Sequence, residues 1–448
     1  MTKKYQLGDD EYEADSEEEI REEIISSGKI ISSPSTILTA LDSNGIIAPI
    51  DKAVVEFEKK TKRSGVGNTV SLGKPAILQA WIEAEDLAYK LYTDRHLYEN
   101  GWEQQTPILI RTFRKDGFSY DDIEYQVKKI KTEEGLYAFI LKPINVPRGA
   151  IPEVKVLFTG TTDRAGGKRD LESKAAGHQS FKREKHNLMA ELNAVVEEIE
   201  GENVKISVIG HSLGGIDALR LALKITQAVA EKLKSSDVYS FFKEAYYKIA
   251  NSSKDNQTDS KKANKPNPSY EGLTSKKIDL HIVASEAPKS TKKQSQKFAD
   301  NLQIATSGDT DNPLKVEATI FNIQEDIVPL FGEQNMLIQK TSDGTKSVLS
   351  MMDATVVSVK TNSFNHSINF YHNPEHPEVH EIEILRIEKG APDPNMEKKI
   401  ADRLNKGIPR FIFENTIKKI IDRITIHLGW GEVLNSDPQP APAIPTCA

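Results

Sequence analysis

The chain has 448 residues, of which 38% are hydrophobic, and this is enough apolar surface for a substantial core. Its 59 Lys and Arg residues against 66 Asp and Glu residues give a net charge of -7, so no nucleic-acid partner is expected from overall charge. The only cysteine, Cys447, excludes an internal disulfide framework and a cysteine-rich metal site.

The first residues lack the apolar core of a secretory signal, and no stretch approaches the roughly 18 apolar residues of a membrane span. We therefore expect a protein that is cytoplasmic as synthesised. Export by a specialised secretion system stays open, because a route that reads no N-terminal signal peptide would leave no mark in this sequence.

Residues 1–74 are acidic between Asp9 and Glu23 and then rich in Ser, Gly and Lys. This composition predicts a loosely packed, acidic and polar N-terminal extension, with an acidic docking tail as the alternative. Residues 75–94 carry apolar side chains at helical spacing, which predicts an amphipathic helix at the start of a compact domain spanning residues 75–400.

Strand-like and helix-like segments alternate through this domain. The alternation predicts an α/β fold with a mostly parallel central sheet flanked by helices. The expected strands are residues 136–141, 154–158, 204–209, 278–284, 316–323 and 354–359, and the expected helices are residues 186–200 and 214–233. An insertion at about residues 226–277 combines an aromatic segment with a polar tract, and it is either a lid over the site or an ordinary packed helix.

The pentapeptide Gly210-His-Ser-Leu-Gly214 satisfies G-x-S-x-G and lies between an apolar strand and a helical segment. Strand, sharp turn and helix are the context that this motif requires, so Ser212 is the candidate nucleophile. The backbone N–H of Leu213 would supply one oxyanion donor. Thr161, just after the strand ending at Phe158 and Gly160, would supply the other.

Several of these segments resemble the class 3 (fungal-type) lipase family. Phe158-Thr-Gly-Thr161 is similar to the family's Phe-Arg-Gly-Thr/Ser pattern, and Gly210 to Gly215 match its Gly-His-Ser-Leu-Gly-Gly elbow at all six positions. Gly177-His-Gln-Ser-Phe181 and Ala284-Ser-Glu-Ala-Pro288 resemble two further segments, although Ser180 stands where the family has Gly. The resemblance implies an α/β-hydrolase fold and lipid esters as substrates.

The acid and the histidine of such a site should follow the serine in that order. Asp326 comes just after the predicted strand 316–323 and lies in an Asp-x-Val-Pro context similar to that of the family's acid. His366 follows the strand 354–359 and is the preferred base, with His372 as the alternative.

Two other interpretations are set aside. Gly166-Gly-Lys-Arg169 suggests a phosphate loop, but the spacing is wrong and Arg169 stands where Ser or Thr is required. His372, His376 and His380 are spaced as on a helical face, but prolines interrupt the segment. We therefore expect neither a metal nor another cofactor.

Residues 401–448 are expected to form a C-terminal amphipathic helix followed by a Pro-rich tail. The apolar face of residues 409–428 could make a peripheral membrane contact or pack on the domain.

The sequence as a whole predicts a serine hydrolase of carboxylic esters, a lipase or phospholipase that acts through a Ser-Asp-His triad and an acyl-enzyme. A non-lipolytic esterase or thioesterase is the alternative, as is a catalytically retired scaffold that serves as a binding protein. More weakly, the combination of a lipase-like domain with polar extensions is similar to SidB-type bacterial effector hydrolases.

Overall fold

The computed structural model describes residues 3–7, 10–14, 60, 74–93, 107–113, 120–131, 136–161, 169, 175–235, 270–307, 313–324, 326, 328–330, 332–361, 379–391 and 393–404. Residues 405–448 lie outside the described residues. Residues 236–269 of the predicted insertion, His366, His372 and the predicted helix 409–428 also lie outside the described residues.

Within the predicted N-terminal extension, two short strands pair antiparallel, and this pairing was not expected from the composition. They are β1 (Lys3–Leu7) and β2 (Asp10–Ala14), with Lys4 and Glu13 as partners in the register.

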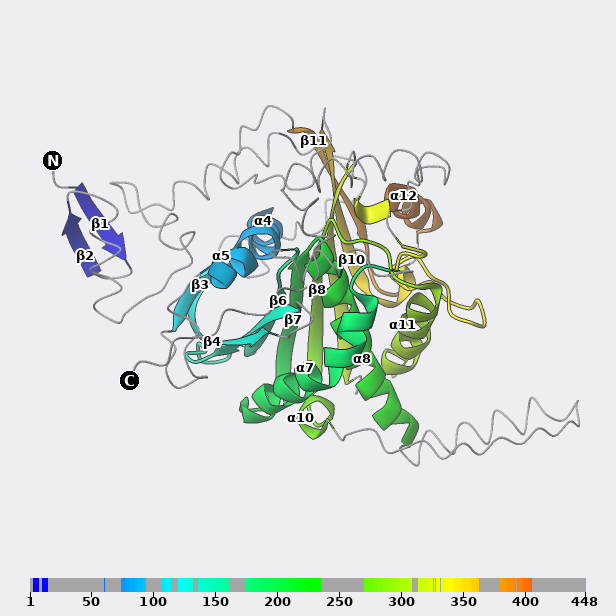
Figure 1. Ribbon diagram of the computed structural model, residues 1–448, viewed down its shortest axis with the longest axis horizontal. Helices are drawn as coiled ribbons and strands as arrows, with labels where there is room; N and C mark the ends of the chain where they lie inside the picture. The colour runs from blue at the N-terminus through cyan, green and yellow to red at the C-terminus, as the bar shows by residue number, and fades with distance from the viewer. Residues whose placement is uncertain are drawn as a thin grey trace, which may run out of the picture. The chain divides into compact units, whose positions relative to one another are not determined.

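The centre of the fold is a nine-stranded sheet in the order β11-β10-β9-β8-β7-β6-β5-β4-β3 (Figure 1). The five central strands, β6 to β10, are mutually parallel, and the remaining strands add to the two edges antiparallel. Their bounds are β3 (Ile108–Phe113), β4 (Tyr120–Lys131), β5 (Tyr137–Pro143), β6 (Glu153–Phe158), β7 (Asn203–His211), β8 (Lys277–Ser285), β9 (Leu314–Ile323), β10 (Asp353–Thr361) and β11 (Val379–Ile387).

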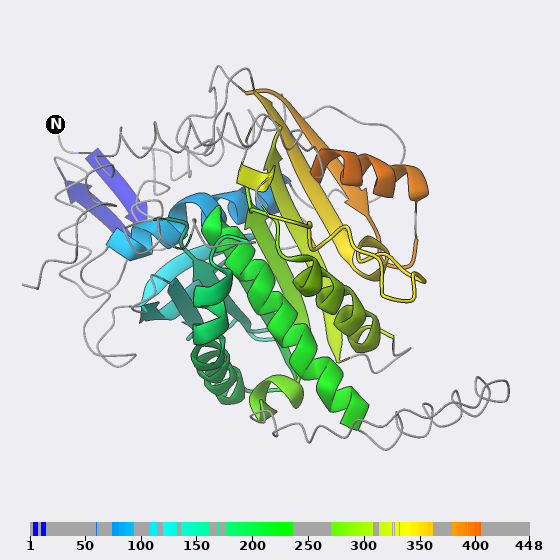
Figure 2. The ribbon, with the colours of Figure 1, turned by 45° about the vertical axis from the view of Figure 1, so that its right-hand side comes forward.

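Helices cover both faces of this sheet, which explains why its central strands are apolar along most of their length. Side chains alternate between two cores, so that Val208 of β7 packs with one face and Ile209 with the other. The first face is covered by α7 (His178–Glu198), α8 (Leu213–Ser235), α11 (Lys292–Ala305) and α12 (Pro394–Leu404), with the short α10 (Glu271–Thr274) beside α7. Figure 2 shows α8 and α11 side by side on that face.

The opposite face is covered by one helical segment in three parts: α4 (Lys74–Ile82), the π-helical turn η1 (Glu83–Leu87) and α5 (Ala88–Thr93). Trp81 stacks on Phe321 of β9 with ring centroids 5.2 Å apart. A π-helical turn widens a helix by one residue, and such turns are frequent at functional sites.

The predicted α/β class, with helices flanking a sheet whose central strands are parallel, is confirmed. The helix expected from residue 186 begins earlier, at His178, because Gly177 adopts a left-handed conformation there and Phe181 is buried against the core. Residues 226–235 of the predicted insertion continue α8. Within the described residues, no helix is both long and apolar enough to cross a membrane.

Candidate active site

Ser212 occupies a sharp turn between β7, which ends at His211, and α8, which begins at Leu213. Its φ of 55° is left-handed, and among the described non-glycine residues only Glu286 shares a positive φ. Such a backbone costs free energy and is retained where the surrounding structure enforces it. The strand, turn and helix arrangement expected for the motif is therefore present at Ser212.

The glycines around Ser212 are required by close backbone packing. A Cβ on Gly210 would lie 2.3 Å from the carbonyl oxygen of Gly214, and a Cβ on Gly214 would lie 2.4 Å from the carbonyl oxygen of Phe158. Neither atom can move without moving the backbone. The start of α8 is thus pressed against the end of β6, and only glycine permits this approach.

The backbone of Ser212 is fixed on both sides. Its N–H donates to the carbonyl oxygen of Ser285 at the end of β8, at 2.8 Å. Its carbonyl oxygen accepts from the N–H of Gly215 at 2.9 Å. The turn is therefore attached to the neighbouring parallel strand as well as to its own helix.

The segment after β6 runs directly beside Ser212. A Cβ on Gly160 would lie 3.2 Å from Cβ of Ser212, and Thr161 is the next residue. Leu213 is the first residue of α8, where backbone N–H groups have no acceptor within the helix. The structure thus brings together Ser212, Leu213 and the segment that contains Thr161.

Asp326 lies just beyond β9, at the edge of the sheet where β6 to β10 end. Its side chain is buried, and its Oδ1 accepts from the N–H of Val328 at 3.0 Å. β8 separates β9 from β7, so the end of β8 lies between the segment of Asp326 and Ser212. β10 ends at Thr361 on the same edge, but the predicted bases His366 and His372 lie outside the described residues.

Glu286 was missed by sequence reasoning, although it occupies this edge. It follows β8, is fully buried and has a φ of 49°. Its Oε1 accepts from the N–H of Ile323 at 2.6 Å. Burial raises the pKa of Glu286 well above its ordinary range, and the neighbouring Asp326 and Glu85 raise it further. A charged residue at the end of an apolar strand was the available signal.

The covering helix also contributes polar side chains that the sequence did not single out. The hydroxyl of Tyr89 accepts from the N–H of Gly160 and lies 3.0 Å from Nδ1 of His211. Glu85, in the π-helical turn, accepts a hydrogen bond of 2.7 Å from the hydroxyl of Ser285. The helix predicted for residues 75–94 therefore contacts the ends of β6, β7 and β8 beside Ser212.

Glu83 makes the third polar contact of this helix. Its carboxylate accepts two hydrogen bonds, of 2.9 and 3.0 Å, from Nζ of Lys155 on β6, and both side chains are buried. The neighbouring carboxylates hold the pKa of Lys155 above its ordinary range despite burial, which by itself lowers it. Removing either partner would leave an uncompensated buried charge.

The start of α7 is held against α8 by buried ion pairs. Asp217 of α8 accepts from both Arg169 and Arg220, and Arg220 also donates to the carbonyl oxygen of Ala176 at 2.6 Å. Arg169, the residue that excluded a phosphate loop, is thus part of an ion-pair cluster. This cluster attaches Arg169 and Ala176, which precede α7 in the chain, to α8.

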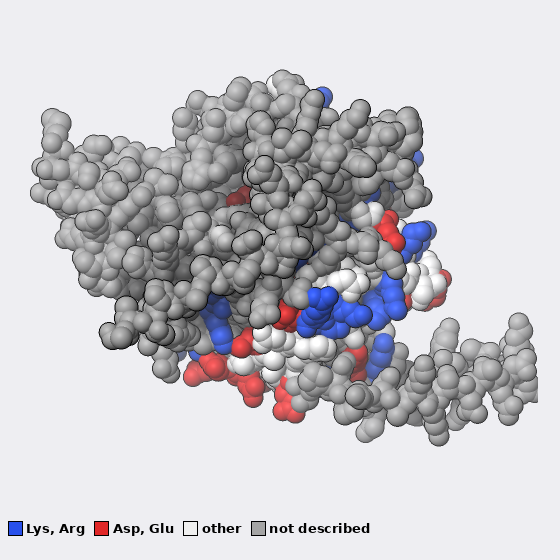
Figure 3. Space-filling model, viewed as in Figure 1, with Lys and Arg blue, Asp and Glu red and all other residues white. Residues whose placement is uncertain are grey.

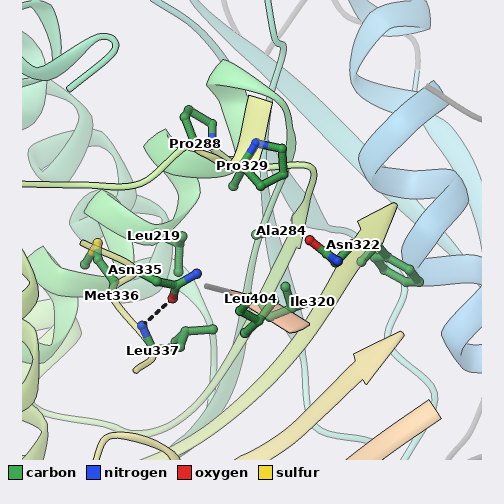
Figure 4. Close-up of a pocket in the computed structure, with 12 residues that line it drawn as sticks. Leu219, Ala284, Pro288, Ile320, Asn322, Pro329, Asn335, Met336, Leu337 and Leu404 are labelled. Carbon is green, nitrogen blue, oxygen red and sulfur yellow. Dashed lines mark hydrogen bonds between the residues drawn. The ribbon is translucent and has the colours of Figure 1, made fainter. Parts of the chain in front are cut away.

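A small cavity lies behind this edge, between α8 and the ends of β8 and β9, and its lining combines apolar side chains with Asn322 and Asn335 (Figure 4). Leu219, Ile320 and Leu404 line it together with Pro329, which belongs to the segment after Asp326. Its volume of about 20 Å³ is room for about one water molecule. It is too small to hold an acyl chain.

Among the described residues, no three His, Cys, Asp or Glu side chains are arranged to hold a metal ion. Compared with protein-family models, with curated proteins and with solved structures, the chain matches none of them.

Proposed function

We propose that this chain is a serine hydrolase of the α/β-hydrolase type that cleaves carboxylic esters, with Ser212 as its nucleophile. The observation that carries the proposal is the left-handed backbone of Ser212 at the turn from β7 to α8, with Gly160 beside it. This strained turn presents a serine hydroxyl at a helix N-terminus, where developing negative charge is stabilised.

In the proposed reaction, the hydroxyl oxygen of Ser212 attacks the ester carbonyl carbon while His366 accepts its proton. The N–H groups of Thr161 and Leu213 donate to the oxyanion that forms. When the tetrahedral intermediate collapses, the bond to the alcohol breaks and His366 returns the proton to the alcohol. Asp326 orients the imidazole and stabilises its protonated form.

Water completes the cycle by the same steps. His366 removes a proton from the water that attacks the acyl-enzyme, and Ser212 regains its proton as the carboxylic acid leaves. His372 is the alternative base.

Lipid esters are the proposed substrate class, because the elbow of residues 210–215 and the strand end at Thr161 resemble those of class 3 lipases. The elbow motif itself serves esterases and thioesterases equally well. A panel of p-nitrophenyl esters of increasing chain length, together with phospholipids in vesicles, separates these activities. A lipase should prefer long chains presented at an interface, and a simple esterase short soluble ones.

Labelling with a fluorophosphonate probe tests the proposal directly, because the probe reacts with an activated serine and needs no knowledge of the substrate. We expect the full-length chain to be labelled and the Ser212→Ala variant not to be. Ser307→Ala is the matched control, since Ser307 is exposed at the end of α11 and should not affect labelling. A folded wild-type chain that takes up no label would favour the binding-protein alternative.

A further inference from the structure

The residue that follows β8, Glu286, has the features of a side chain held in place by the surrounding structure. It is fully buried, and its φ of 49° is left-handed. Its N–H donates to the carbonyl oxygen of Phe321 at 3.2 Å, and its Oε1 accepts from the N–H of Ile323 at 2.6 Å. A buried carboxyl on a strained backbone costs free energy twice, and such features concentrate at functional sites.

Glu286 and Asp326 are attached to the same residue at the end of β9. The side chain of Glu286 accepts from the N–H of Ile323, while the N–H of Asp326 donates to the carbonyl oxygen of Ile323 at 3.1 Å. Oε2 of Glu286 is buried and meets no hydrogen-bond donor among the described residues, and the carboxyl group of Asp326 is one of its neighbours. Two ionised carboxylates repel each other, whereas a protonated carboxyl can donate a hydrogen bond to an ionised neighbour, so the pair is more stable when one group is neutral.

The surroundings decide which group is neutral. The carboxylates that face Glu286 are Asp326, at the end of β9, and Glu85, in the π-helical turn. Glu85 is itself held by the hydroxyl of Ser285 at 2.7 Å. Burial and these two negative neighbours disfavour the charged form of Glu286, so Glu286 is the group expected to hold the proton.

We propose that Glu286 is a positioning residue, whose carboxyl group donates a hydrogen bond to Asp326 and holds this acid in the orientation that the base requires. The proposal rests on the proposed function, in which Asp326 is the acid of the triad. In this arrangement Glu286 keeps its proton. The residue after β8 would therefore supply a hydrogen-bond donor beside Asp326.

This role joins the nucleophile and the acid through one short segment. Ser285 accepts the backbone hydrogen bond of Ser212, and the next residue contacts Asp326. Ser285 is the last residue of β8 and Glu286 is the next residue. A change in the side chain of Glu286 would therefore alter the surroundings of Asp326 while leaving the backbone hydrogen bond between Ser212 and Ser285 in place.

The first test compares Glu286→Gln with Glu286→Leu in the full-length chain, using hydrolysis of a soluble p-nitrophenyl ester. Glutamine accepts from Ile323 and donates to Asp326, so it should keep kcat within about threefold of wild type. Leucine does neither, and loss of a hydrogen bond to a charged group should lower kcat by roughly 10- to 100-fold with little change in KM. Rescue by glutamine distinguishes positioning from simple packing.

The second test does not depend on activity. The infrared carbonyl band of a protonated carboxylic acid should be present in the wild-type chain at neutral pH and absent from Glu286→Gln. At high pH, ionisation of Glu286 should lower wild-type activity, and this alkaline decline should disappear in Glu286→Gln. Thermal unfolding of each variant establishes that it is folded.

The outcomes separate this inference from the proposed function. Absence of the band at neutral pH, or an unchanged kcat in Glu286→Leu, would overturn the role of Glu286 even if Ser212→Ala abolishes probe labelling. Failure of the wild-type chain to react with the probe, with the band present, would overturn the hydrolase instead. Equal loss of kcat in the glutamine and leucine variants would also contradict the positioning role.

Discussion

The hydroxyl of Tyr89 lies 3.0 Å from Nδ1 of His211, the residue that immediately precedes the candidate nucleophile. The same oxygen accepts a hydrogen bond of 3.0 Å from the N–H of Gly160. One hydroxyl therefore joins the end of β7 to the segment that leads to Thr161, and its own proton can be donated to the imidazole. Tyr89 therefore holds Gly160 close to His211. We expect it to position the neighbouring Thr161, whose N–H would donate to the oxyanion.

We expect Tyr89→Phe to keep the packing of the ring and to lose both hydrogen bonds. At about 0.5–1.5 kcal/mol each, their loss should lower the free energy of unfolding by roughly 1–3 kcal/mol. It should also reduce kcat/KM by about tenfold, if one such bond positions the oxyanion donors. Urea denaturation measures the free energy of unfolding, and ester hydrolysis measures kcat/KM.

The control is Tyr92→Phe on the same helical segment, because the ring of Tyr92 packs against Tyr137 and this packing would be retained. Equal behaviour of the two variants would rule out the role given to Tyr89.

Gly160→Ala should disturb the contact between Tyr89 and the segment that contains Thr161. The new Cβ would lie 2.2 Å from the hydroxyl of Tyr89 and 3.2 Å from Cβ of Ser212. Overpacking of this kind lowers the free energy of unfolding by about 1–3 kcal/mol. Because the segment that contains Thr161 would be displaced, kcat/KM should fall further in Gly160→Ala than in Tyr89→Phe.

A double variant identifies the cause. Tyr89→Phe removes the atom that the new methyl group would meet, so combining it with Gly160→Ala should cost less than the sum of the single changes. Strict additivity of the two free energies would contradict the proposed clash. Gly149→Ala is the comparison, because its Cβ would meet no atom within 4 Å and only the φ of 84° would be strained.

The strands and helices around Ser212 were predictable because buried parallel strands appear in a sequence as continuous apolar runs. β4 was missed because Lys128, Lys129 and Lys131 interrupt its alternation, and α11 because it has few apolar residues. The side chains that surround Ser212 were not predictable in the same way. Glu286 could be noted from its place after an apolar strand, but its side chain accepts from the N–H of Ile323, 37 residues away, and no local pattern predicts that contact.

The ion-pair cluster of Asp217 with Arg169 and Arg220 should be essential for stability. Asp217→Asn removes the charge between two buried guanidinium groups, and breaking such a cluster costs about 3–5 kcal/mol. A large shift of the urea midpoint is expected. Glu198→Gln is the control, since Glu198 is largely exposed and pairs with Lys142 at the surface, where ion pairs contribute at most about 1 kcal/mol. A midpoint unchanged in Asp217→Asn would mean that the cluster is dispensable.

Lysine side chains from three helices converge near the middle of α8, and Figure 3 shows Lys and Arg side chains gathered over α8 and α11. Burial, then Lys185 of α7 and Lys297 of α11, lower the pKa of Lys224 to about 8. The unfolded chain holds this proton up to the ordinary pKa of 10.5. The charge of Lys224 therefore destabilises the folded state fully below pH 8, and the cost is removed as the pH rises from about 8 to 10.5.

Lys224→Met should accordingly raise Tm at pH 7 by about 2 °C, the shift expected for roughly 1 kcal/mol in a large domain. The advantage over wild type should shrink at pH 10. Differential scanning fluorimetry at both pH values measures it. Lys398→Met on the exposed side of α12 should change Tm little at either pH. If Lys224→Met instead lowered Tm at pH 7, the charge of Lys224 would stabilise the folded state, and the prediction would be wrong.

His281 should make the fold sensitive to acid. It lies on β8 with Nε2 3.0 Å from the hydroxyl of Thr319, and burial, reinforced by Lys205, lowers its pKa to about 4. The unfolded chain takes up this proton at the ordinary pKa of 6.5, whereas the folded chain does so only near pH 4. Its contribution to stability is thus fully present above pH 6.5 and is lost as the pH falls toward 4.

His281→Gln keeps a partner for Thr319 and cannot take up a proton. The free energy of unfolding of wild type should therefore fall relative to that of the variant by on the order of 2 kcal/mol between pH 6.5 and pH 4. Urea denaturation across this range gives the difference directly, and subtracting the two curves removes the carboxylates common to both. His380→Gln is the control, because His380 is exposed on β11. If the free energies of unfolding of wild type and His281→Gln changed in parallel with pH, His281 would take up its proton as readily in the folded chain as in the unfolded chain, and the prediction would be wrong.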